Sequence, residues 1–450
     1  MEAFELSKEF LEEFVTQLDL KKEDELIPVL ERLFPADIAE TFDSLNLEQA
    51  VYVTSLLDAD KKIEVLAELD PEVQIKFFKG FTREEIALNF IQNMDSDDAV
   101  DVLSVIDAEA ATEILSYIPD KQDSLYLTRL LRYPDNTAGG LMGGELIKVN
   151  INWNVAQCTE EIRKQAEEVS KVFTVYVVDD SDILLGWVSL KKIILAKATT
   201  PISEIFDSNI KYATVTTDGE DIASTMQKYD LIALPIVDSL NRLLGRVTID
   251  DVLDFVKEEA DKDYQMLSGI SQNVEVKDKV WVLSKARLPW LIIGLFGGVL
   301  SSIVIGQFDG ELQENVQLAL FMPLIMAMAG NIGVQSSSII VQGLANNTID
   351  SSSVITKLGK ELMVALINGL VCSALLMGYG LIAGKTNSIM TTVSIALFAV
   401  ILLAAVVGTV VPLILDRFKI DPALATGPFI TTSNDLLGLF LYFMIGKMLI

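Results

Sequence analysis

A single carboxylate lies in the middle of the last apolar stretch of the chain. Asp435 belongs to the segment TTSNDLLGLFLY, inside an apolar run at about 423–447 that is long enough to cross a bilayer. A charged side chain at that depth costs roughly 2.5–3.5 kcal/mol even on the most favourable insertion scale. The one base of this run, Lys447, lies at its far end. An unpaired acid in a bilayer must be protonated or face water and a cation, so Asp435 predicts a water-filled path.

Other polar residues follow the spacing of one helix face in two of the apolar segments. Around the acid they are Thr431, Asp435, Gly438 and Tyr442. In the segment AGNIGVQSSSIIVQG they are Asn331, Gln335, Ser338 and Gln342. Hydrogen bonds between membrane helices would account for the amides alone. They do not account for the carboxylate, so we interpret Asp435 as part of a pore wall.

The composition separates an acidic part from an apolar part. The chain has 450 residues, of which 35 are basic and 64 acidic, and from residue 284 onward the two kinds are equal in number. The whole net charge of −29 therefore lies in 1–283, where it repels nucleic acid and attracts metal cations. Histidine is absent, which excludes a histidine triad and a histidine-ligated metal. Cys158 and Cys372 suggest neither a disulfide framework nor a zinc site.

The acidic part divides into two kinds of sequence. Residues 1–131 have apolar positions at helical spacing and acids at N-cap positions (Asp58, Asp70, Asp95), which predicts a superhelix of short helices. Residues 132–258 contain a duplication at about 140–198 and 200–258, in which each copy reads strand, turn, LLG, strand and helix. A long acidic helix is expected to connect this part, over 254–283, to the apolar part.

Five membrane helices are predicted within 284–450, at about 286–306, 316–345, 360–384, 390–415 and 423–447. Basic residues precede the first segment and lie in alternate loops, namely Lys285, Arg287, Lys357, Lys360, Arg417 and Lys419. The positive-inside rule then places the N-terminus in the cytosol and the C-terminus outside. The first residues, MEAFELSKEF, are acidic and amphipathic and are not those of a signal peptide, which agrees with that orientation.

Long segments resemble the MgtE family of magnesium channels and transporters over essentially the whole chain. PLIMAMAGNIGVQSSSIIVQGLA and DPALATGPFITTSNDLLGLFLYF resemble the second and fifth membrane helices of the family. LLRYPDNTAGGLM and YDLIALPIVDSLNRLLGRVTIDDVLDFV resemble its linker and its second CBS domain. The resemblance implies a multidomain membrane protein with an α-helical superhelical N domain, tandem α+β CBS domains, a connecting (plug) helix and five transmembrane helices. It also implies a homodimer in the cell (inner) membrane.

The resemblance further implies a Mg²⁺-selective channel for magnesium uptake that cytosolic Mg²⁺ closes. Asp435 and Thr431 would contact the ion, and Asn331, Gln335 and Gly438 would line the pore. The regulatory ions would be bound by acids of the N domain, the second CBS domain, the connecting helix and the membrane face, for which the matching residues are Asp97, Asp101, Asp250, Glu258, Asp261 and Asp421. Asp95 and Asp98 compete with the two N-domain positions.

The CBS resemblance also implies a nucleotide site, with ATP as a candidate ligand. The motif Gly-x-x-Thr-x-x-Asp is present in the second copy as Gly245, Thr248 and Asp251. The first copy has Ser189 but carries Lys192 in place of the acid, so one site per chain is expected.

Enzyme activity is not expected, because an intramembrane aspartyl protease needs two facing acids and the membrane part offers only Asp435 at depth. A coupled divalent-cation secondary transporter or an exporter is the alternative function. A third alternative, a receptor whose membrane helices only transmit a signal, would not explain a carboxylate at the depth of Asp435.

Overall fold

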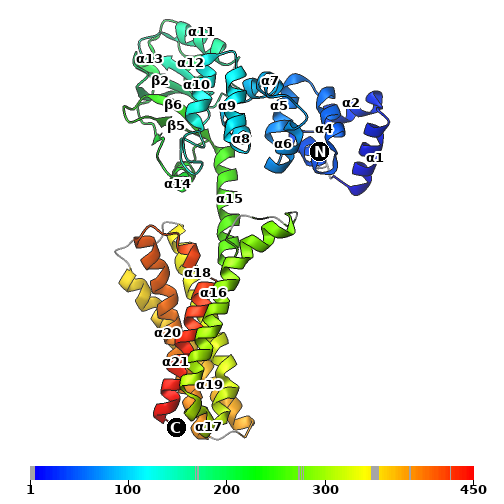
Figure 1. The fold of residues 1–450 in the computed structure, drawn as a ribbon. Coiled ribbons are helices and arrows are strands. Elements are labelled where there is room, and N and C mark those ends of the chain that lie inside the picture. The colour runs from blue at the N-terminus through cyan, green and yellow to red at the C-terminus, as the bar shows by residue number, and fades with distance from the viewer. Residues whose placement is uncertain are drawn as a thin grey trace. The chain divides into compact units, whose positions relative to one another are not determined.

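The chain forms two compact units, Met1–Val256 and Lys257–Ile450. In this computed structural model the described residues are 6–167, 169, 172–271, 274, 276, 278–345, 354–384, 387–425 and 427–449. Figure 1 shows the order of the elements along the chain from blue to red. The helix α15 (Ile249–Leu267) begins in the first unit and ends in the second.

Ten short α-helices and two 3₁₀ turns make up the first part of unit one. They are α1 (Lys8–Asp19), α2 (Glu23–Arg32), α3 (Pro35–Thr41), η1 (Phe42–Ser44), α4 (Leu47–Leu56), α5 (Ala59–Ala67), α6 (Pro71–Phe78), α7 (Arg83–Asn89), η2 (Ile91–Asn93), α8 (Ser96–Ser104), α9 (Ala108–Tyr117) and α10 (Lys121–Leu130). Asp58 caps α5 by accepting the N–H of Lys61 at 2.9 Å, and Asp70 and Asp95 stand at the N-cap positions of α6 and α8 as predicted. Alternating caps and apolar faces therefore explain why the helices are short and pack into one core.

The second part of unit one contains two three-stranded sheets with the same topology. The first copy has β1 (Ile147–Asn150), α11 (Val155–Gln165), β2 (Val175–Val178), β3 (Leu184–Val188), α12 (Leu190–Leu195) and α13 (Ile202–Ile205). The second has β4 (Ala213–Thr214), α14 (Gly219–Tyr229), β5 (Ala233–Val237), β6 (Leu243–Thr248) and the start of α15. In each copy the first two strands are parallel and the last two antiparallel, with a register shift at Val177/Val178 and at Ile236/Val237.

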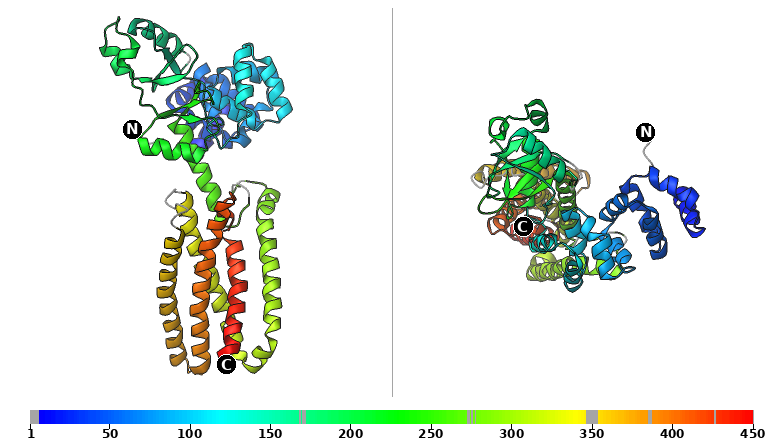
Figure 2. Two further views of the ribbon diagram at one scale, coloured as in Figure 1. Left: turned by 90° about the vertical axis from the view of Figure 1, so that its left-hand side faces the viewer. Right: turned by 90° about the horizontal axis from the view of Figure 1, so that it is seen from above.

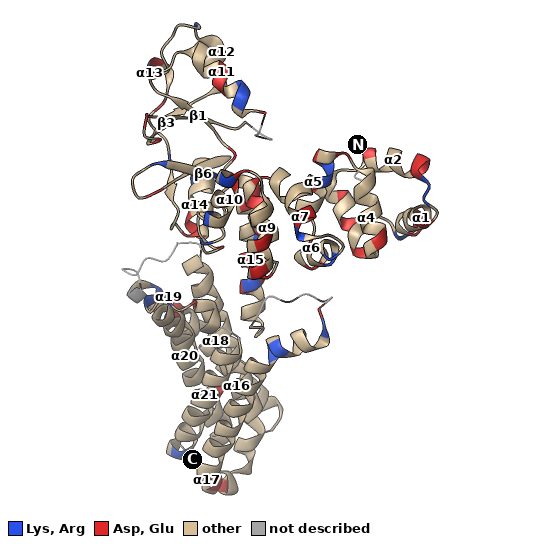
Figure 3. Ribbon diagram, turned by 45° about the horizontal axis from the view of Figure 1, so that its top comes forward, with Lys and Arg blue, Asp and Glu red and all other residues tan. Residues whose placement is uncertain are grey.

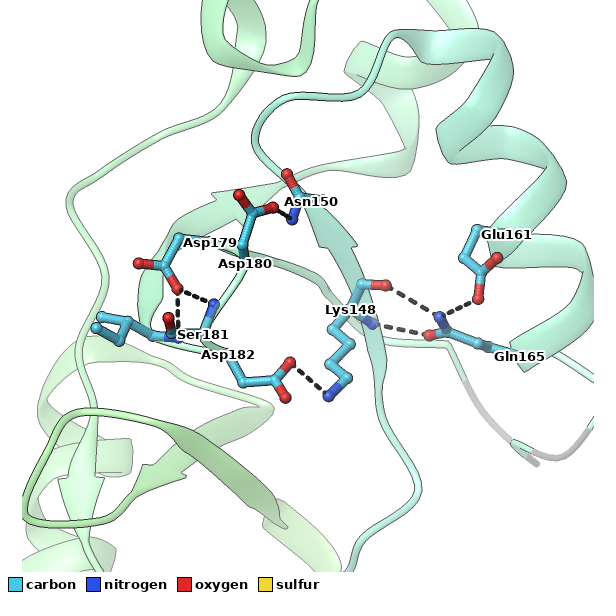
Figure 4. A network of polar contacts seen from close by, with 9 residues as sticks. Lys148, Asn150, Glu161, Gln165, Asp179, Asp180, Ser181 and Asp182 are labelled. Carbon is cyan, nitrogen blue, oxygen red and sulfur yellow. Dashed lines mark hydrogen bonds and ion pairs between the residues drawn. The ribbon is translucent and has the colours of Figure 1, made fainter.

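The turn between the last two strands is also duplicated. Asp179 and Asp238 each accept backbone N–H groups two and four residues later, at 2.8 and 3.0 Å in the first copy and 2.8 and 2.9 Å in the second. Three residues after these acids, Asp182 (φ 62°) and Asn241 (φ 59°) adopt the left-handed conformation. Figure 4 shows the first turn, where Asp182 also pairs with Lys148 at 2.7 Å. The predicted duplication is confirmed in these details.

Unit two is a bundle of long helices that run side by side (Figure 2). It contains α16 (Val280–Gln307), α17 (Asp309–Glu314), η3 (Val316–Phe321), α18 (Met322–Ala345), α19 (Val354–Ile382), α20 (Asn387–Arg417), η5 (Pro422–Ala425) and α21 (Pro428–Leu449). Among the residues described, five helical segments are long and apolar enough to cross a membrane, as predicted. The fifth begins at Pro428 and not near 423, because η5 and the left-handed Gly427 (φ 59°) separate it from the preceding loop.

Glycines let the helices around Asp435 approach closely. A Cβ atom on Gly408 of α20 would lie 2.4 Å from the carbonyl oxygen of Gly333 in α18. A Cβ on Gly333 would lie 1.8 Å from Nδ2 of Asn434 in α21. Small residues at helix crossings bring backbones together in membranes, where packing rather than the hydrophobic effect drives association. These contacts fix α18, α20 and α21 against one another and so set the position of the acid.

Candidate ion pathway and cation-sensing sites

A pocket of about 360 Å³ lies between α18 and α21, and Asp435 is part of its wall. It is lined by Met326, Ala327, Gly330, Asn331, Val334, Gln335, Thr431 and Asp435. Gly330 leaves room for the acid, because a Cβ there would lie 3.5 Å from Asp435 Oδ1 and 3.0 Å from Thr431 Cγ2. The two polar helix faces predicted from the sequence therefore meet at one pocket.

One oxygen of the carboxylate in this pocket has no hydrogen-bond partner among the described residues. Asp435 Oδ1 is buried and accepts no hydrogen bond from any residue that the structure describes. Thr431, one turn earlier, donates its hydroxyl to the carbonyl oxygen of Gly427 at 3.0 Å. Lys447 is held elsewhere, in an ion pair with Glu311 at 2.8 Å. The acid therefore retains its capacity to bind a cation or the water around one.

Two residues of the predicted face do not reach the pocket. Gly438 is buried against helices α18 and α20, where a Cβ would lie 3.1 Å from Ala329 Cβ and 3.2 Å from Val400 Cγ1. Tyr442 is fully buried and donates its hydroxyl to the carbonyl oxygen of Leu318 at 2.9 Å. Along this face of α21, Thr431 and Asp435 line the pocket, whereas Gly438 and Tyr442 are packed against neighbouring helices.

The pocket suits a hydrated divalent ion. Mg²⁺ takes six ligands and keeps most of its waters, and six waters at about 30 Å³ each occupy roughly 180 Å³. The side chains of Asn331 and Gln335 can accept or donate hydrogen bonds to such waters, and Asp435 supplies the negative charge. A pocket of this kind can select an ion by its charge and hydrated size without removing its water ligands.

A second group of acids lies in unit one, where α8 meets the second sheet copy and the linker before β1. Ser96 donates its backbone N–H to Glu145 at 2.9 Å and its hydroxyl at 3.1 Å, which ties the linker to α8. A Cβ on Gly143 would lie 2.6 Å from Asp97 Oδ2, so the linker passes directly over that carboxylate. Figure 3 shows acidic residues in red on α9 and along α15, whereas α16, α18 and α20 are almost wholly tan.

Crowding and burial shift these acids toward the protonated form. Burial first, and then the charges of Asp251 and Asp98, raise the pKa of Asp97 well above its usual range. Burial and the charge of Asp95 raise the pKa of Asp98 to about 7. Burial also raises the pKa of Glu145 and of Asp251. Ionising all of them at once is unfavourable unless a cation is present, which is the electrostatic property expected of a cation sensor.

The structure groups these acids differently from the sequence expectation. The charge of Asp251, which the motif had assigned to a nucleotide, acts on Asp97, and Asp250, the acid assigned to the sensor, is its neighbour on α15. Asp101 acts on Asp98 and lies at the edge of the group. Asp251 and Glu145 are the members that sequence reasoning did not assign to the sensor. No sequence signal distinguishes Asp251 from Asp250, since adjacent helix positions differ only in the direction in which they point.

The expected nucleotide motif is internally bonded. Thr248 donates both its hydroxyl and its backbone N–H to Asp251 Oδ2, the latter at 3.2 Å. A Cβ on Gly245 would lie 2.7 Å from the carbonyl oxygen of Gly143, so the linker covers this strand. In the first copy, Lys192 donates its ammonium group to the carbonyl oxygen of Ile205 at 2.9 Å.

A third group of acids lies at the end of α15 and the loop before η5, within unit two. Asp263 and Glu259 share a helix face, and their charges and that of Asp421 act on one another. Glu258 and Asp261, the positions expected from the sequence, are exposed neighbours on other faces of α15. The spacing of four between Glu259 and Asp263 could have identified this face. Within the described ranges, no three acidic or cysteine side chains converge closely enough to hold a metal ion.

The comparisons with known proteins agree with this architecture. A family model described as MgtE divalent cation transporter matches residues 322–445, the MgtE intracellular N domain matches 33–136, and a CBS domain matches 202–258. The chain is 30% identical to the magnesium transporter MgtE of Bacillus subtilis, over 93% of this chain and 92% of that protein. It is 32% identical to the Thermus thermophilus protein of the same name, over 94% of each.

Two solved structures are similar to about the first half of the chain. A crystal structure of the soluble part of a magnesium transporter covers 56% of this chain and 98% of its own, with 25% identity and a TM-score of 0.51. The cytosolic domain of the Mg²⁺ channel MgtE in complex with ATP covers 53% and 98%, with 32% identity and a TM-score of 0.50. The sequence identity across nearly the full length, the matched domains and the five candidate spans agree, and the chain belongs to the MgtE family of magnesium transporters.

Proposed function

We propose that this protein is a Mg²⁺-selective channel for magnesium uptake, with Asp435 as its selectivity residue. The observation that carries the proposal is a buried carboxylate oxygen, in a pocket between two candidate membrane helices, that accepts no hydrogen bond from the described residues. Such a group is costly in a membrane unless an ion or water meets it. A hydrated divalent ion satisfies it through outer-sphere contacts that are weak enough to allow release.

A homodimer completes the pathway in this proposal. The pocket is lined by α18 and α21 of one chain, and a second copy across a two-fold axis would bring a second Asp435 to the same ion. Two carboxylates would balance the charge of one Mg²⁺ ion. The protein would lie in the cell membrane with its acidic part in the cytosol and its C-terminus outside, following the basic residues of alternate loops.

Cytosolic Mg²⁺ would close the pore by binding to the acids of the cytosolic part. The candidate ligands are Asp97, Asp98, Asp101, Glu145, Asp250, Asp251, Glu258, Glu259, Asp261, Asp263 and Asp421. At low Mg²⁺ the acids repel one another and favour an expanded arrangement. Bound ions stabilise the compact state that they fit, and the closing of the pore then depends on several weak sites acting together.

ATP is a further candidate ligand of the CBS domains. A related cytosolic domain has been solved with ATP. In this chain we propose one nucleotide site, at Gly245, Thr248 and Asp251. Because Asp251 also faces Asp97, nucleotide and Mg²⁺ would compete for, or share, that carboxylate.

A coupled secondary transporter or an exporter is the second candidate, and proteoliposomes distinguish it from a channel. Purified protein is reconstituted into vesicles that contain a Mg²⁺ indicator. A K⁺ gradient and valinomycin then set a membrane potential that is negative either inside or outside. A channel takes up Mg²⁺ under an inward-negative potential with no Na⁺ or H⁺ gradient. Uptake that requires a Na⁺ or H⁺ gradient, or that ignores the potential, would favour the coupled mechanism.

A further inference from the structure

The last turns of α21 are hydrogen-bonded to the segment that joins α16 to α18. The hydroxyl group of Tyr442 donates to the carbonyl oxygen of Leu318 at 2.9 Å. Both residues are buried, with 0% and 1% of their surface exposed. A tyrosine hydroxyl in an apolar core needs such an acceptor, because leaving it without one costs free energy. This hydrogen bond therefore joins α21 to η3 inside the bundle.

Two further contacts connect α21 to the same segment. The ring of Phe308 stacks on that of Phe443, with the centroids 5.0 Å apart and the planes at 16°. The ammonium group of Lys447 pairs with Glu311 at 2.8 Å, but the Lys447 side chain is 65% exposed, so solvent weakens this pair. The buried hydrogen bond and the ring pair are therefore the contacts that we expect to hold α21 here.

The hydrogen bond connects the two walls of the pocket around Asp435. Leu318 lies in η3, which continues at Met322 into α18, and the pocket residue Met326 follows one turn later. Tyr442 is seven residues after Asp435 on α21, which places it on the same side of the helix and roughly 10 Å further along the axis. The bond thus fixes the separation of α18 and α21 just beyond the acid.

Close packing carries that separation from the hydrogen bond to the acid. Between the two, a Cβ on Gly438 would lie only 3.1 Å from Ala329 Cβ of α18, so the helices are in direct contact there. Because close-packed interiors transmit displacements, a shift of Tyr442 away from η3 moves the pocket wall at Asp435.

The separation of the pocket walls matters because Mg²⁺ and Ca²⁺ need different spaces. Mg²⁺ demands a near-octahedral shell at about 2.0–2.1 Å, whereas Ca²⁺ takes six to eight ligands at about 2.3–2.6 Å in a flexible arrangement. A narrow and rigid pocket therefore favours Mg²⁺, and a wider or looser one tolerates the larger shell of Ca²⁺.

We propose that Tyr442 is a positioning residue for ion selectivity, whose bond to Leu318 keeps the pocket around Asp435 narrow and rigid enough to favour Mg²⁺ over Ca²⁺. The inference rests on the proposed role of Asp435 and extends it to a side chain that does not line the pocket. Without the hydroxyl group, η3 and α21 separate more readily, and the pocket discriminates less between the two ions.

Uptake of Mg²⁺ and of Ca²⁺ into proteoliposomes tests the proposal with Tyr442→Phe, which removes the hydroxyl group and keeps the ring. The ratio of Mg²⁺ to Ca²⁺ uptake should fall about two- to tenfold, the factor that corresponds to one neutral hydrogen bond. Tyr379→Phe, which changes an exposed tyrosine of α19 in the same way, should keep the wild-type ratio. A role in folding alone would lower the uptake of both ions together, and an unchanged ratio would overturn the proposal.

Hydrogen exchange on the full-length protein in detergent micelles gives a readout that does not depend on transport. The amides of 318–326 should exchange about two- to tenfold faster in Tyr442→Phe than in the wild type or in Tyr379→Phe. Phe308→Leu removes the stacked ring from the same segment, and it should change both measurements in the same direction even if Tyr442→Phe does not fold.

The outcomes separate this inference from the proposed function. Wild-type exchange or an unchanged ion ratio in Tyr442→Phe and Phe308→Leu, in a protein whose wild type prefers Mg²⁺, would overturn the role of Tyr442 and leave that of Asp435 intact. A wild type that takes up Mg²⁺ and Ca²⁺ equally would instead overturn the proposed selectivity itself, and with it the positioning role.

Discussion

The protein uses carboxylates in two opposite ways in its two units. At the junction of α8 with the second sheet copy, several acids lie close together, and burial first, and then the charges of their neighbours, raise their pKa values. In the membrane bundle, a single acid per chain stands in a pocket with amide and apolar neighbours, and its Oδ1 has no partner among the described residues. Near α8 the negative charge is shared by several carboxylates, whereas the pocket of the helical bundle contains one carboxylate, that of Asp435.

In the proposed function, the two regions have different tasks with a cation: one senses its concentration and the other conducts it. A sensor must respond to a concentration, so weak and cooperative sites serve it, and losing one acid leaves others. A conducting site must admit one ion and release it, so one acid from each chain in a closely fitted space is enough, and no other acid lines the pocket. We therefore expect mutations in the first region to have graded effects and mutation of Asp435 in the second to abolish conduction.

The largest effect is expected at Asp435. Asp435→Asn keeps the shape and removes the charge, so Mg²⁺ uptake into proteoliposomes should fall about a hundredfold or more, which corresponds to roughly 3 kcal/mol of lost ion stabilisation. Asp416→Asn, at the exposed end of α20, should leave uptake unchanged. Both variants should elute as folded protein in size-exclusion chromatography. Wild-type uptake by Asp435→Asn would end the claim that one acid controls conduction.

A smaller, graded effect is expected at the junction of α8 with the second sheet copy. Asp97→Asn combined with Asp251→Asn removes two charges that repel each other, so the melting temperature of unit one without Mg²⁺ should rise, by about 2–4 °C for each kcal/mol of relieved repulsion. The further rise on adding Mg²⁺ should shrink, and each single variant should give part of the effect. Glu160→Gln with Glu204→Gln, two exposed acids of the first copy, serves as the control. An undiminished Mg²⁺ response in the double variant would place the sensor elsewhere.

The same junction predicts a pH dependence with a definite sign. The pKa of Asp98 is raised to about 7 in the folded protein, whereas an unfolded Asp titrates near about 4. The folded state therefore binds more protons between these values, and its stability falls as pH rises from about 4 to about 7. Thermal melts in Mg²⁺-free buffer should show this fall, and Asp98→Asn should reduce it. Stability that rises across the same window would show that the acids are not crowded.

The smallest effect concerns nucleotide binding. Calorimetry with ATP should find one site per chain, and Asp251→Ala should weaken binding at least about tenfold, because a hydrogen bond to a charged group contributes at least about 1.5 kcal/mol. Lys192→Ala should not change the affinity, since that side chain is bound to the carbonyl oxygen of Ile205. Two equal sites would show that the duplication is functional as well as structural.

Sequence reasoning captured what depends on periodicity. Apolar length identified five spans, and helical spacing brought Asn331, Gln335, Thr431 and Asp435 to one pocket. Helical spacing alone could not predict which side chains of one helix face point into a pocket and which pack against a neighbouring helix. Gly438 follows the same spacing but is buried against Ala329, because α21 closes against α18 and α20 beyond the acid.

The acids of unit one and of α15 show the same limit. Asp251 and Asp250 are adjacent, and the charge of Asp251, which the motif had assigned to a nucleotide, acts on Asp97. On α15, the charges of Glu259, Asp263 and Asp421 act on one another, and Glu258 and Asp261, the positions named from the sequence, are exposed. A pattern of acids predicts that a helix carries charge, but the rotation of that helix against its neighbour depends on contacts distant in sequence.

Current through inside-out membrane patches tests the central claim most directly, because it reports conduction and closing in one protein. With Mg²⁺ as the only permeant cation outside, the wild type should carry inward current that falls steeply as Mg²⁺ on the cytosolic face reaches millimolar levels, with a Hill coefficient above one. Asp435→Asn should carry no Mg²⁺ current at any concentration. Wild-type current that cytosolic Mg²⁺ does not affect, or Mg²⁺ current through Asp435→Asn, would contradict the account.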